Sequence, residues 1–231
     1  MDGKNDPPMS NEELIARDWI KVVESDKGRV RTKDIYPLLK GWAERAPGES
    51  ILEIGCGQGI CSTAFDLSGR RYTGVELSPF LMDRAMQLYQ SPRCSFLQGN
   101  ALQLPLADES FDAVFSVAVW HLLDDLQRAA REMSRVLRSR GKYALIVPNP
   151  KAYRSWTSPY SDIKRNGIRF EGSLNIGDNC RVNEVLFLHS EDQILAALAN
   201  SRLQVETRET FRFVDADPQT GLFLYIDGTK L

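Results

Sequence analysis

The sequence predicts an α/β fold built on a doubly wound, mostly parallel sheet, with helices on both faces and a small cap. From residue 50 to residue 149, short runs rich in β-branched and aromatic residues alternate with longer stretches of helical periodicity. This alternation is typical of parallel strands joined by right-handed crossovers. The first of these runs leads directly into a glycine-rich loop, residues 55–59. Because ligands of such folds bind at the carboxyl ends of the strands, we expect a ligand there.

The composition favours one globular domain with a cap or insertion. The chain has 231 residues, of which 42% are hydrophobic and 26% are charged, so it is long enough to bury one sizeable core. Its 29 basic and 31 acidic residues give a net charge of −2, with no run of five Lys or Arg residues. Nucleic acids and anionic membranes usually bind basic surfaces, so neither partner is favoured. We expect a small-molecule substrate and a monomer or homodimer.

The four cysteines are Cys56, Cys61, Cys94 and Cys180, and they form no CxxC pair and no metal-ligand spacing with the two histidines. They are interpreted as reduced thiols of an intracellular protein, and no metal site is expected. The N-terminal residues lack the apolar stretch of a signal peptide, and no later run is long enough to span a membrane. We therefore expect a cytoplasmic protein.

The N-terminal region is predicted to contain two helices. Residues 1–9 are polar and rich in proline and glycine, which indicates a disordered tail. Ser10 begins a capping-box pattern, and apolar residues recur after it at helical spacing. A second helix is predicted from about residue 32 to residue 44. We expect the helices, over residues 10–46, to form a lid over the ligand.

The central region is predicted to supply most of the sheet. Its strand candidates are residues 50–54, 71–75, 94–97, 113–117 and 142–147. Helical periodicity lies between them near residues 59–67, 79–89 and 126–137. The second of these helices begins with Ser78 as N-cap and Pro79 in the first turn.

Residues 150–189 interrupt this alternation and are interpreted as a cap insertion. They are rich in Asn, Gly, Ser and aromatic residues, with short strands predicted near residues 168–174 and 185–188. Tyr153, Trp156 and Tyr160 either line a substrate pocket or form the small core of the cap. After the insertion, a helix capped by Ser190 precedes an antiparallel pair of strands, residues 203–214 and 222–226.

Two acidic residues narrow the choice of ligand. Glu76 is the first residue past the apolar end of the second strand, where a carboxylate can accept hydrogen bonds from both hydroxyls of a ribose. The alternative is an exposed glutamate at a strand end. Glu53 stands two positions before Gly55, in a G-x-G-x-G loop and not the G-x-G-x-x-G of dinucleotide folds. A negative charge there repels a pyrophosphate and suits a sulfonium or an ammonium group.

Several segments together resemble the class I (Rossmann-like) S-adenosylmethionine-dependent methyltransferase family, small-molecule type, over about residues 31–227. These segments are Glu53 to Gly59, Gly74 to Ser78, Gly99 to Pro105, Asp108 to Asp112 and Arg135 to Leu137. The resemblance implies a single methyltransferase domain over residues 10–231. It also implies a seven-stranded sheet of order 3-2-1-4-5-7-6 with the last strand antiparallel, and S-adenosyl-L-methionine as the cofactor.

The resemblance also implies which residues bind the cofactor. The loop, through Gly55, Cys56, Gly57 and Gly59, holds the methionine part. Glu53 lies near its amino group and Glu76 binds the ribose. Leu77 packs on the adenine, and Asn100 and Ala101 recognise it. The family commonly has aspartate at the position of Asn100. Ser116 and Val117 pass beneath the methyl group. Arg31 either reaches the cofactor carboxylate or is a solvated surface residue.

The predicted function is transfer of a methyl group to an oxygen or nitrogen of a small molecule. The chain lacks the Asn/Asp-Pro-Pro-Tyr/Phe motif of nucleic-acid amino methyltransferases and the Pro-Cys pair of cytosine C5 enzymes. His121 and His189 are the candidate proton acceptors. The alternatives are that His121 packs locally or contacts the cofactor, and that His189 satisfies a backbone carbonyl. An NAD(P)-dependent oxidoreductase and a non-catalytic S-adenosylmethionine-binding module remain alternative functions.

Overall fold

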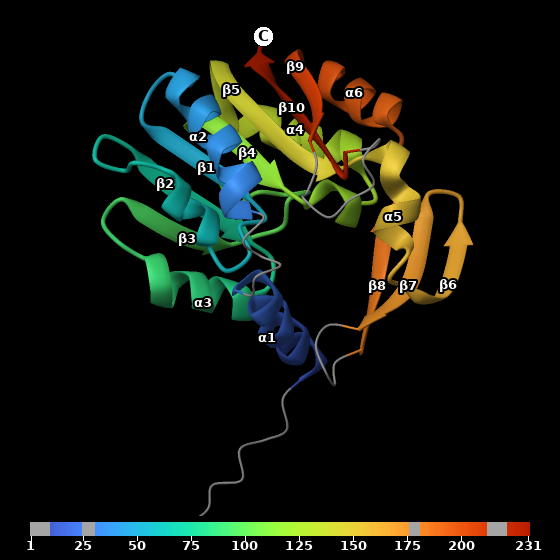
Figure 1. Cartoon of the computed structure of the whole chain (residues 1–231). Helices are drawn as coiled ribbons and strands as arrows, with labels where there is room; N and C mark the ends of the chain where they lie inside the picture. Colours follow the sequence, from blue (N-terminus) through green and yellow to red (C-terminus); the bar gives the residue numbers. More distant parts are fainter. Residues whose placement is uncertain (1–9, 25–30, 176–180, 212–220) are drawn as a thin grey trace, which may run out of the picture.

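The computed structural model describes residues 10–24, 31–175, 181–211 and 221–231, so the tail predicted at residues 1–9 lies outside the described residues. A seven-stranded sheet with the order β3-β2-β1-β4-β5-β10-β9 forms its centre (Figure 1). Its strands are β1 (Ser50–Ile54), β2 (Arg71–Glu76), β3 (Cys94–Gln98), β4 (Phe111–Val117), β5 (Leu137–Pro148), β9 (Leu203–Phe211) and β10 (Phe223–Lys230).

The sheet has the predicted topology. Strands β1 to β5 are parallel to one another, and β10 is antiparallel to both β5 and β9. When only the strands of this sheet are numbered in chain order, the arrangement is 3-2-1-4-5-7-6 with the seventh strand antiparallel. The predicted fold class and strand order are therefore confirmed.

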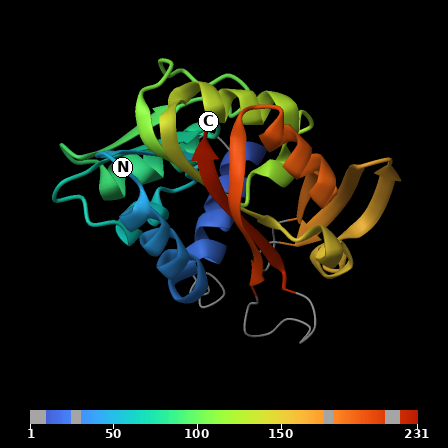
Figure 2. The ribbon, with the colours of Figure 1, turned by 90° about the horizontal axis from the view of Figure 1, so that it is seen from above.

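Helices cover both faces of the sheet because its central strands are apolar on both sides. On one face, α2 (Tyr36–Arg45) and α3 (Pro79–Tyr89) contribute to a core that includes Ile51. On the other face, α4 (Leu126–Val136) and α6 (Glu191–Ala199) contribute to a core that includes Leu52. Figure 2 shows α2 (blue) and α4 (yellow-green) on opposite sides of the sheet.

Side-chain caps start three of the helices where the sequence predicts them. Helix α1 (Asn11–Glu24) begins after Ser10, whose Oγ accepts a hydrogen bond from the backbone N–H of Glu13. The Ser78 hydroxyl caps α3 in the same way, with Pro79 in its first turn. Ser190 forms a complete capping box with Gln193 at the start of α6. Each cap satisfies N–H groups that have no partner within the helix.

The helix predicted at residues 59–67 is wrong. Only a short 3-10 turn, Ile60–Ala64, follows the glycine loop. The Ser62 hydroxyl donates to the Gly59 carbonyl and the Thr63 hydroxyl donates to the Ile60 carbonyl, at 2.7 and 2.8 Å. Such side-chain bonds compete with helix formation for the same carbonyl groups. The second predicted helix also differs, because it begins with a π-helical turn, Arg31–Ile35, and continues as α2.

The insertion between β5 and α6 folds as a helix and a second sheet. It contains a 3-10 turn (Pro150–Ala152), α5 (Tyr153–Thr157), β6 (Ser161–Asn166), β7 (Arg169–Asn175) and β8 (Arg181–Phe187). These three strands form an antiparallel sheet of order β6-β7-β8, where the sequence predicts two short strands. Its small core includes Phe170 and Leu186.

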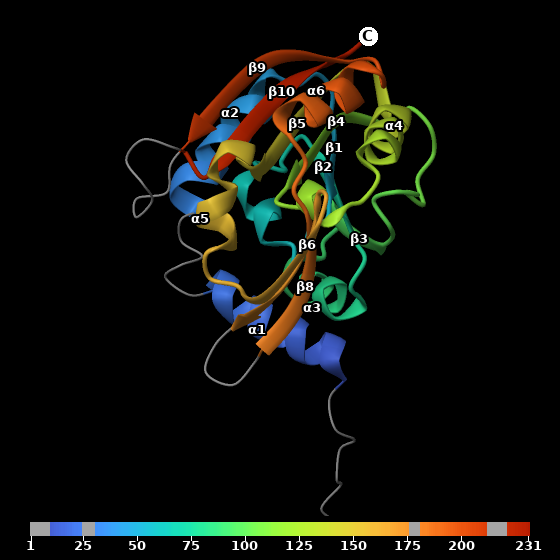
Figure 3. The same cartoon turned by 90° about the vertical axis from the view of Figure 1, so that its right-hand side faces the viewer.

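Helix α1 and the small sheet both lie at one end of the main sheet, as the two side views show (Figures 1 and 3). They flank the edge at which the parallel strands β1, β2 and β4 end, and all three regions line one cavity. Within the described part of the chain, no helix is long and apolar enough to cross a membrane.

Candidate active site

The glycine loop after β1 takes a backbone conformation that favours glycine. Gly55, Gly57 and Gly59 have φ angles of +75°, +55° and +79°, in the left-handed region that is strained for residues with a Cβ. A Cβ on Gly55 would lie 2.3 Å from Cγ2 of Val119, and one on Gly59 would lie 2.8 Å from Cβ of Ala85. A Cβ on Gly57 would meet no heavy atom within 4 Å. The loop is therefore tightly packed at both ends and open in the middle, where Gly57 lines the cavity.

Glu76, the last residue of β2, is held directly against this loop. Its Oε2 accepts a 2.8 Å hydrogen bond from the backbone N–H of Gly57, and its Oε1 accepts a 2.9 Å hydrogen bond from that of Ser78. A carboxylate oxygen has two lone pairs, so each oxygen keeps one for a further donor. The predicted juxtaposition of loop and acid is thus observed, and the carboxylate is oriented for a ligand with two hydroxyl groups.

Glu53, on β1, is a buried carboxylate that lines the cavity. It is only 2% exposed, and the hydroxyl of Tyr72 on β2 donates a hydrogen bond to its Oε2. Burial, and then the negative charge of Glu53, raise the pKa of Tyr72 well above its usual value. Burial and the charges of Glu53 and Glu76 likewise raise the pKa of the Cys56 thiol. Cys56 is therefore a neutral wall residue and not a nucleophile.

Ser116 and Val117 end β4 beneath the glycine loop. The buried Ser116 hydroxyl donates a 2.8 Å hydrogen bond to the carbonyl of Ile54, which ties the end of β4 to the end of β1. Val117 lines the cavity, whereas Ser116 is not among the described residues that do. The chain then turns away through Ala118, whose φ is +55°.

Of the three predicted adenine-binding residues, only Leu77 is among the described residues that line the cavity. Leu77 lines the cavity and is 62% exposed, so it offers apolar surface at the cavity rim. Asn100 lies in the turn after β3, where its Oδ1 accepts a 2.8 Å hydrogen bond from the N–H of Leu102. Asn100 is exposed, and neither it nor Ala101 is among the described residues that line the cavity.

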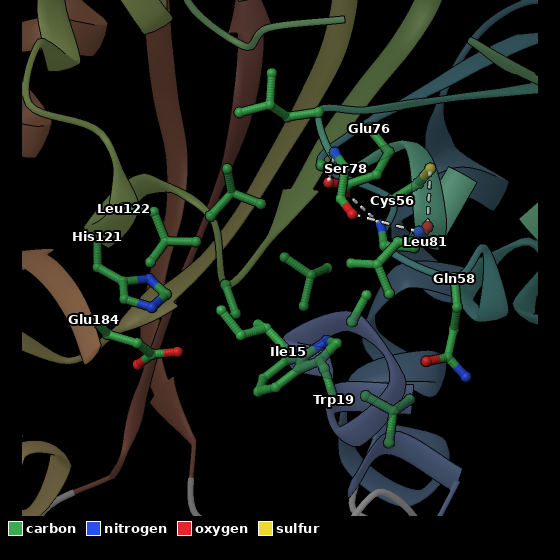
Figure 4. Close-up of a pocket in the computed structure, with 18 of the residues that line it drawn as sticks. Ile15, Trp19, Cys56, Gln58, Glu76, Ser78, Leu81, His121, Leu122 and Glu184 are labelled. Carbon is green, nitrogen blue, oxygen red and sulfur yellow. Dashed lines mark hydrogen bonds between the residues drawn. The ribbon is translucent and has the colours of Figure 1, made fainter. Parts of the chain in front are cut away.

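His121 follows β4 and lines the cavity at the end away from Glu76 (Figure 4). Its ring lies 5.9 Å from that of Trp156 in the cap, and its buried Nδ1 has no hydrogen-bond partner among the described residues. Burial and the nearby His189 lower the pKa of His121 to about 4. The ring is therefore neutral near pH 7, with one nitrogen free to accept a proton.

His189 occupies a different position. Its Nε2 donates a 2.7 Å hydrogen bond to the carbonyl of Leu123, since a carbonyl can only accept. Its own carbonyl accepts a 2.6 Å hydrogen bond from the Tyr153 hydroxyl. His189 is 4% exposed and is not among the described residues lining the cavity. Of the two roles considered from the sequence, the structure shows the contact with a backbone carbonyl.

These elements enclose one cavity of about 530 Å³. Figure 4 shows Glu76, Ser78 and Cys56 at one end, His121 and Glu184 at the other, and Ile15 and Trp19 of α1 below. The wall between these groups is mainly apolar. Its other members include Ala16, Val23, Leu81, Leu122, Trp156, Tyr160, Leu174 and Phe223.

Helix α1 is attached to the loop region by polar contacts. Gln58, in the loop, donates from Nε2 to Oε1 of Glu24 at 3.3 Å, and the same oxygen forms a 3.1 Å ion pair with Arg84 of α3. The ion pair is substantially exposed and so contributes little stability.

Arg31, a predicted cofactor-binding residue, begins the π-helical turn with its backbone. Its side chain lies outside the described residues.

Several residues of the site were missed by sequence reasoning, and three of them bear on its chemistry or shape. Tyr72 is the partner of Glu53, Phe223 is a cavity wall residue from β10, and Glu184 is a carboxylate from β8. A signal for Glu184 was present, because Val182, Glu184 and Leu186 alternate on one face of a strand and only the middle residue is polar. A charged residue on an otherwise apolar strand face is a reason to suspect a binding role.

The residues present fit S-adenosylmethionine. The Glu76 carboxylate meets the loop as a ribose-binding acid requires, and Glu53 places a buried negative charge near the loop, where a cationic group is favoured. The open side of Gly57 leaves room for a ligand against the backbone. No three His, Cys, Asp or Glu side chains gather as a metal site within the described ranges.

Comparison with known proteins agrees with this geometry. A family model described as "Methyltransferase domain" matches residues 52–145, the segment that holds both acids and the loop. Malonyl-[acyl-carrier protein] O-methyltransferase of Serratia marcescens is 32% identical over 132 residues, which are 57% of this chain and 51% of that protein. O-methyltransferase resE of Aspergillus sclerotiorum is 32% identical over 146 residues, or 58% and 55% of the two chains.

The chain spans about half the length of the curated relatives it matches. Among solved structures, an S-adenosylmethionine-dependent methyltransferase of Methanosarcina mazei superposes with a TM-score of 0.65 at 20% identity, covering 82% of this chain and 96% of that one. This structural likeness supports the fold. Together with the family model over residues 52–145, it indicates that this part of the chain is a methyltransferase domain of the class I, S-adenosylmethionine-dependent type.

Proposed function

We propose that the chain transfers a methyl group from S-adenosylmethionine to an oxygen or nitrogen of a small organic molecule. The observation that carries this proposal is the single cavity that joins the acids Glu53 and Glu76 to His121. The end with the two acids suits the cofactor. The other end has the buried Nδ1 of His121, which has no hydrogen-bond partner among the described residues. Two relatives that are 32% identical to this chain are named as O-methyltransferases, which supports an oxygen acceptor.

In this proposal the cofactor-binding residues are those that the sequence indicates. Glu53 binds the amino group, Glu76 the ribose, and the loop from Gly55 to Gly59 the methionine backbone. Leu77, Asn100 and Ala101 form the adenine side, with Ser116 and Val117 beneath the methyl group and Arg31 near the cofactor carboxylate. When bound, S-adenosylmethionine supplies an activated methyl group on a sulfonium, so the protein has mainly to align the acceptor and exclude water.

His121 is the proposed proton acceptor. As the acceptor oxygen or nitrogen bonds to the methyl carbon, the carbon–sulfur bond breaks and its electron pair stays on the sulfur. The acceptor then loses its proton, which a neutral imidazole can take. The lowered pKa of His121, caused by burial and by His189, keeps the ring neutral for this purpose. His189 is proposed to hold the cap against the segment after β4 through its bond to Leu123.

The proposed lid and cap are the parts of the chain that would exclude water from the cavity. We propose one domain over residues 10–231, with a lid over residues 10–46 and a cap over residues 150–189. Ile15 and Trp19 of the lid and Trp156 of the cap face the same cavity. Apolar walls of this kind exclude water from the reacting atoms.

Incubation of the chain with methyl-labelled S-adenosylmethionine and a fractionated metabolite extract tests the proposal. The label is expected in a small-molecule product detected by mass spectrometry. Label found only in RNA or protein would contradict the substrate class. Tight dinucleotide binding without S-adenosylmethionine binding would favour an oxidoreductase, and binding of S-adenosylmethionine without any product would favour a non-catalytic module.

A further inference from the structure

The end of the cavity opposite Glu76 also has a carboxylate, that of Glu184 on β8 (Figure 4). We propose that Glu184 selects a methyl acceptor that carries an organic cation, namely an ammonium or protonated amine group. The inference rests on the proposed methyl transfer and specifies the class of acceptor. The cation is a binding group of the acceptor, and the atom that is methylated lies toward His121.

The charges around the cavity favour a cation over an anion. Its described lining includes the carboxylates of Glu12, Glu53, Glu76 and Glu184 and no Lys or Arg side chain. Glu53 and Glu76 belong to the cofactor end, and Glu12 is exposed at the start of α1. Glu184 is therefore the acid left for the acceptor. An anionic acceptor would be repelled there, which is an effective way to exclude a wrong ligand.

The Glu184 carboxylate is oriented by one hydrogen bond, and no positively charged residue in the described part of the chain pairs with it. It is partly buried, between the buried residues Val182 and Leu186 on the same strand face. Its Oε2 accepts a hydrogen bond from the Tyr160 hydroxyl. Among the residues that the structure describes, its Oε1 has no hydrogen-bond or ion-pair partner. A half-buried carboxylate in a mainly apolar cavity is stabilised by a ligand that brings a positive charge and N–H donors.

Aromatic rings line the same cavity. Tyr160, which donates a hydrogen bond to Glu184, and Trp156 are both lining residues. The Trp156 ring is fixed by a 2.7 Å hydrogen bond from Nε1 to the carbonyl of Leu222. It is also fixed by an edge contact with Phe223, with ring centroids 4.9 Å apart. Organic ammonium groups are attracted to the faces of such rings. His121 is uncharged near neutrality, so it does not repel the cation.

Three probes of similar size and different charge test the inference: 2-phenylethylamine, 2-phenylethanol and phenylacetate. Their binding to the full chain saturated with S-adenosylhomocysteine is measured by ligand-observed NMR titration. We expect the amine to bind at least about tenfold more tightly than the alcohol, and phenylacetate to bind least. In Glu184→Gln, which keeps an oxygen for Tyr160, we expect the amine to lose that advantage while the alcohol binds as before.

Glu171→Gln is the matched control, because Glu171 lies on the adjacent strand β7, pairs with Arg169 and is not among the described lining residues. It should keep the preference for the amine. Equal binding of the three probes, no binding of the amine, or a preference unchanged in Glu184→Gln would overturn the inference. Binding of S-adenosylhomocysteine is measured separately in each protein. Its absence would contradict the proposed function itself, whereas its presence without amine selectivity would contradict only the role of Glu184.

Discussion

The backbone N–H of Gly57 donates a 2.8 Å hydrogen bond to Oε2 of Glu76, so the glycine loop and the acid at the end of β2 form one binding surface. We expect Glu76→Gln to weaken S-adenosylhomocysteine binding by about 10- to 100-fold, because hydrogen bonds to a charged group contribute about 1.5–3 kcal/mol. Isothermal titration calorimetry measures the loss. The far-ultraviolet circular dichroism spectrum should stay unchanged, and an unaltered affinity would contradict the ribose-binding role.

Gly55 and Gly57 differ in their surroundings, and this difference predicts different effects of alanine. Gly55→Ala combines a positive φ with a contact of 2.3 Å to Val119, so we expect a loss of about 2–4 kcal/mol in the free energy of unfolding. Gly57→Ala has open space and only the cost of its φ, about 1–2 kcal/mol. Urea denaturation of both variants measures the two values. Equal losses would show that steric crowding at Gly55 is relieved by movement of Val119.

The two histidines should respond differently to substitution by glutamine. His121→Gln is expected to lower kcat by about 10²- to 10⁴-fold, the usual contribution of a general base, with S-adenosylmethionine affinity within about twofold. His189→Gln is expected mainly to lower stability, since its ring bonds to the Leu123 carbonyl. Single-turnover assays and thermal unfolding separate the two effects. A larger loss of kcat in His189→Gln would assign proton transfer to His189.

The pH dependence of the reaction follows from the environment of His121. Burial and the nearby His189 lower its pKa from 6.5 to about 4. A base with this pKa is neutral and active above about pH 4, and it becomes protonated and inactive below that pH. As the pH is lowered, kcat should therefore decrease with a midpoint near pH 4, where His121 becomes protonated. A fall centred near pH 6.5 would mean that the ring is solvated during turnover.

Asp112 offers a test of stability away from the cavity. Although partial burial opposes it, hydrogen bonds from Ser50, Arg138 and the Glu49 N–H lower its pKa from 3.8 to about 2. Because the folded state has the lower pKa, the stabilisation is present above about pH 4 and is lost as pH falls toward 2. We expect Asp112→Asn to cost about 2–3 kcal/mol at pH 7. Denaturation midpoints of both proteins should converge toward pH 2, and parallel curves would contradict the assignment.

The sequence predicted the parts of the structure that depend on local pattern. Ser78, Pro79 and Ser190 indicated helix starts correctly, because caps act within a few residues. The position of Glu76 beside the loop was predictable because the carboxyl ends of neighbouring parallel strands share one edge of the sheet.

The rest depends on contacts that local pattern does not encode. The 3-10 turn after Gly59 arises from hydroxyl groups that bond to nearby carbonyls, where apolar periodicity indicated an α-helix. The bond between Tyr72 and Glu53 joins side chains of two strands, and neither residue alone indicates it. Glu184 lies on β8, which begins at Arg181, whereas the predicted strand began only at residue 185 and left Glu184 outside it.

The hydrogen bond from the Tyr153 hydroxyl to the His189 carbonyl joins two residues 36 positions apart, near the two ends of the cap. The segment between them is consequently a module whose entry and exit are fixed at one place beside the main sheet. Its length and side chains can diverge between related proteins while the strands that hold the glycine loop keep their register. Exchanging the segment between these two residues is therefore a direct way to change the proposed methyl acceptor.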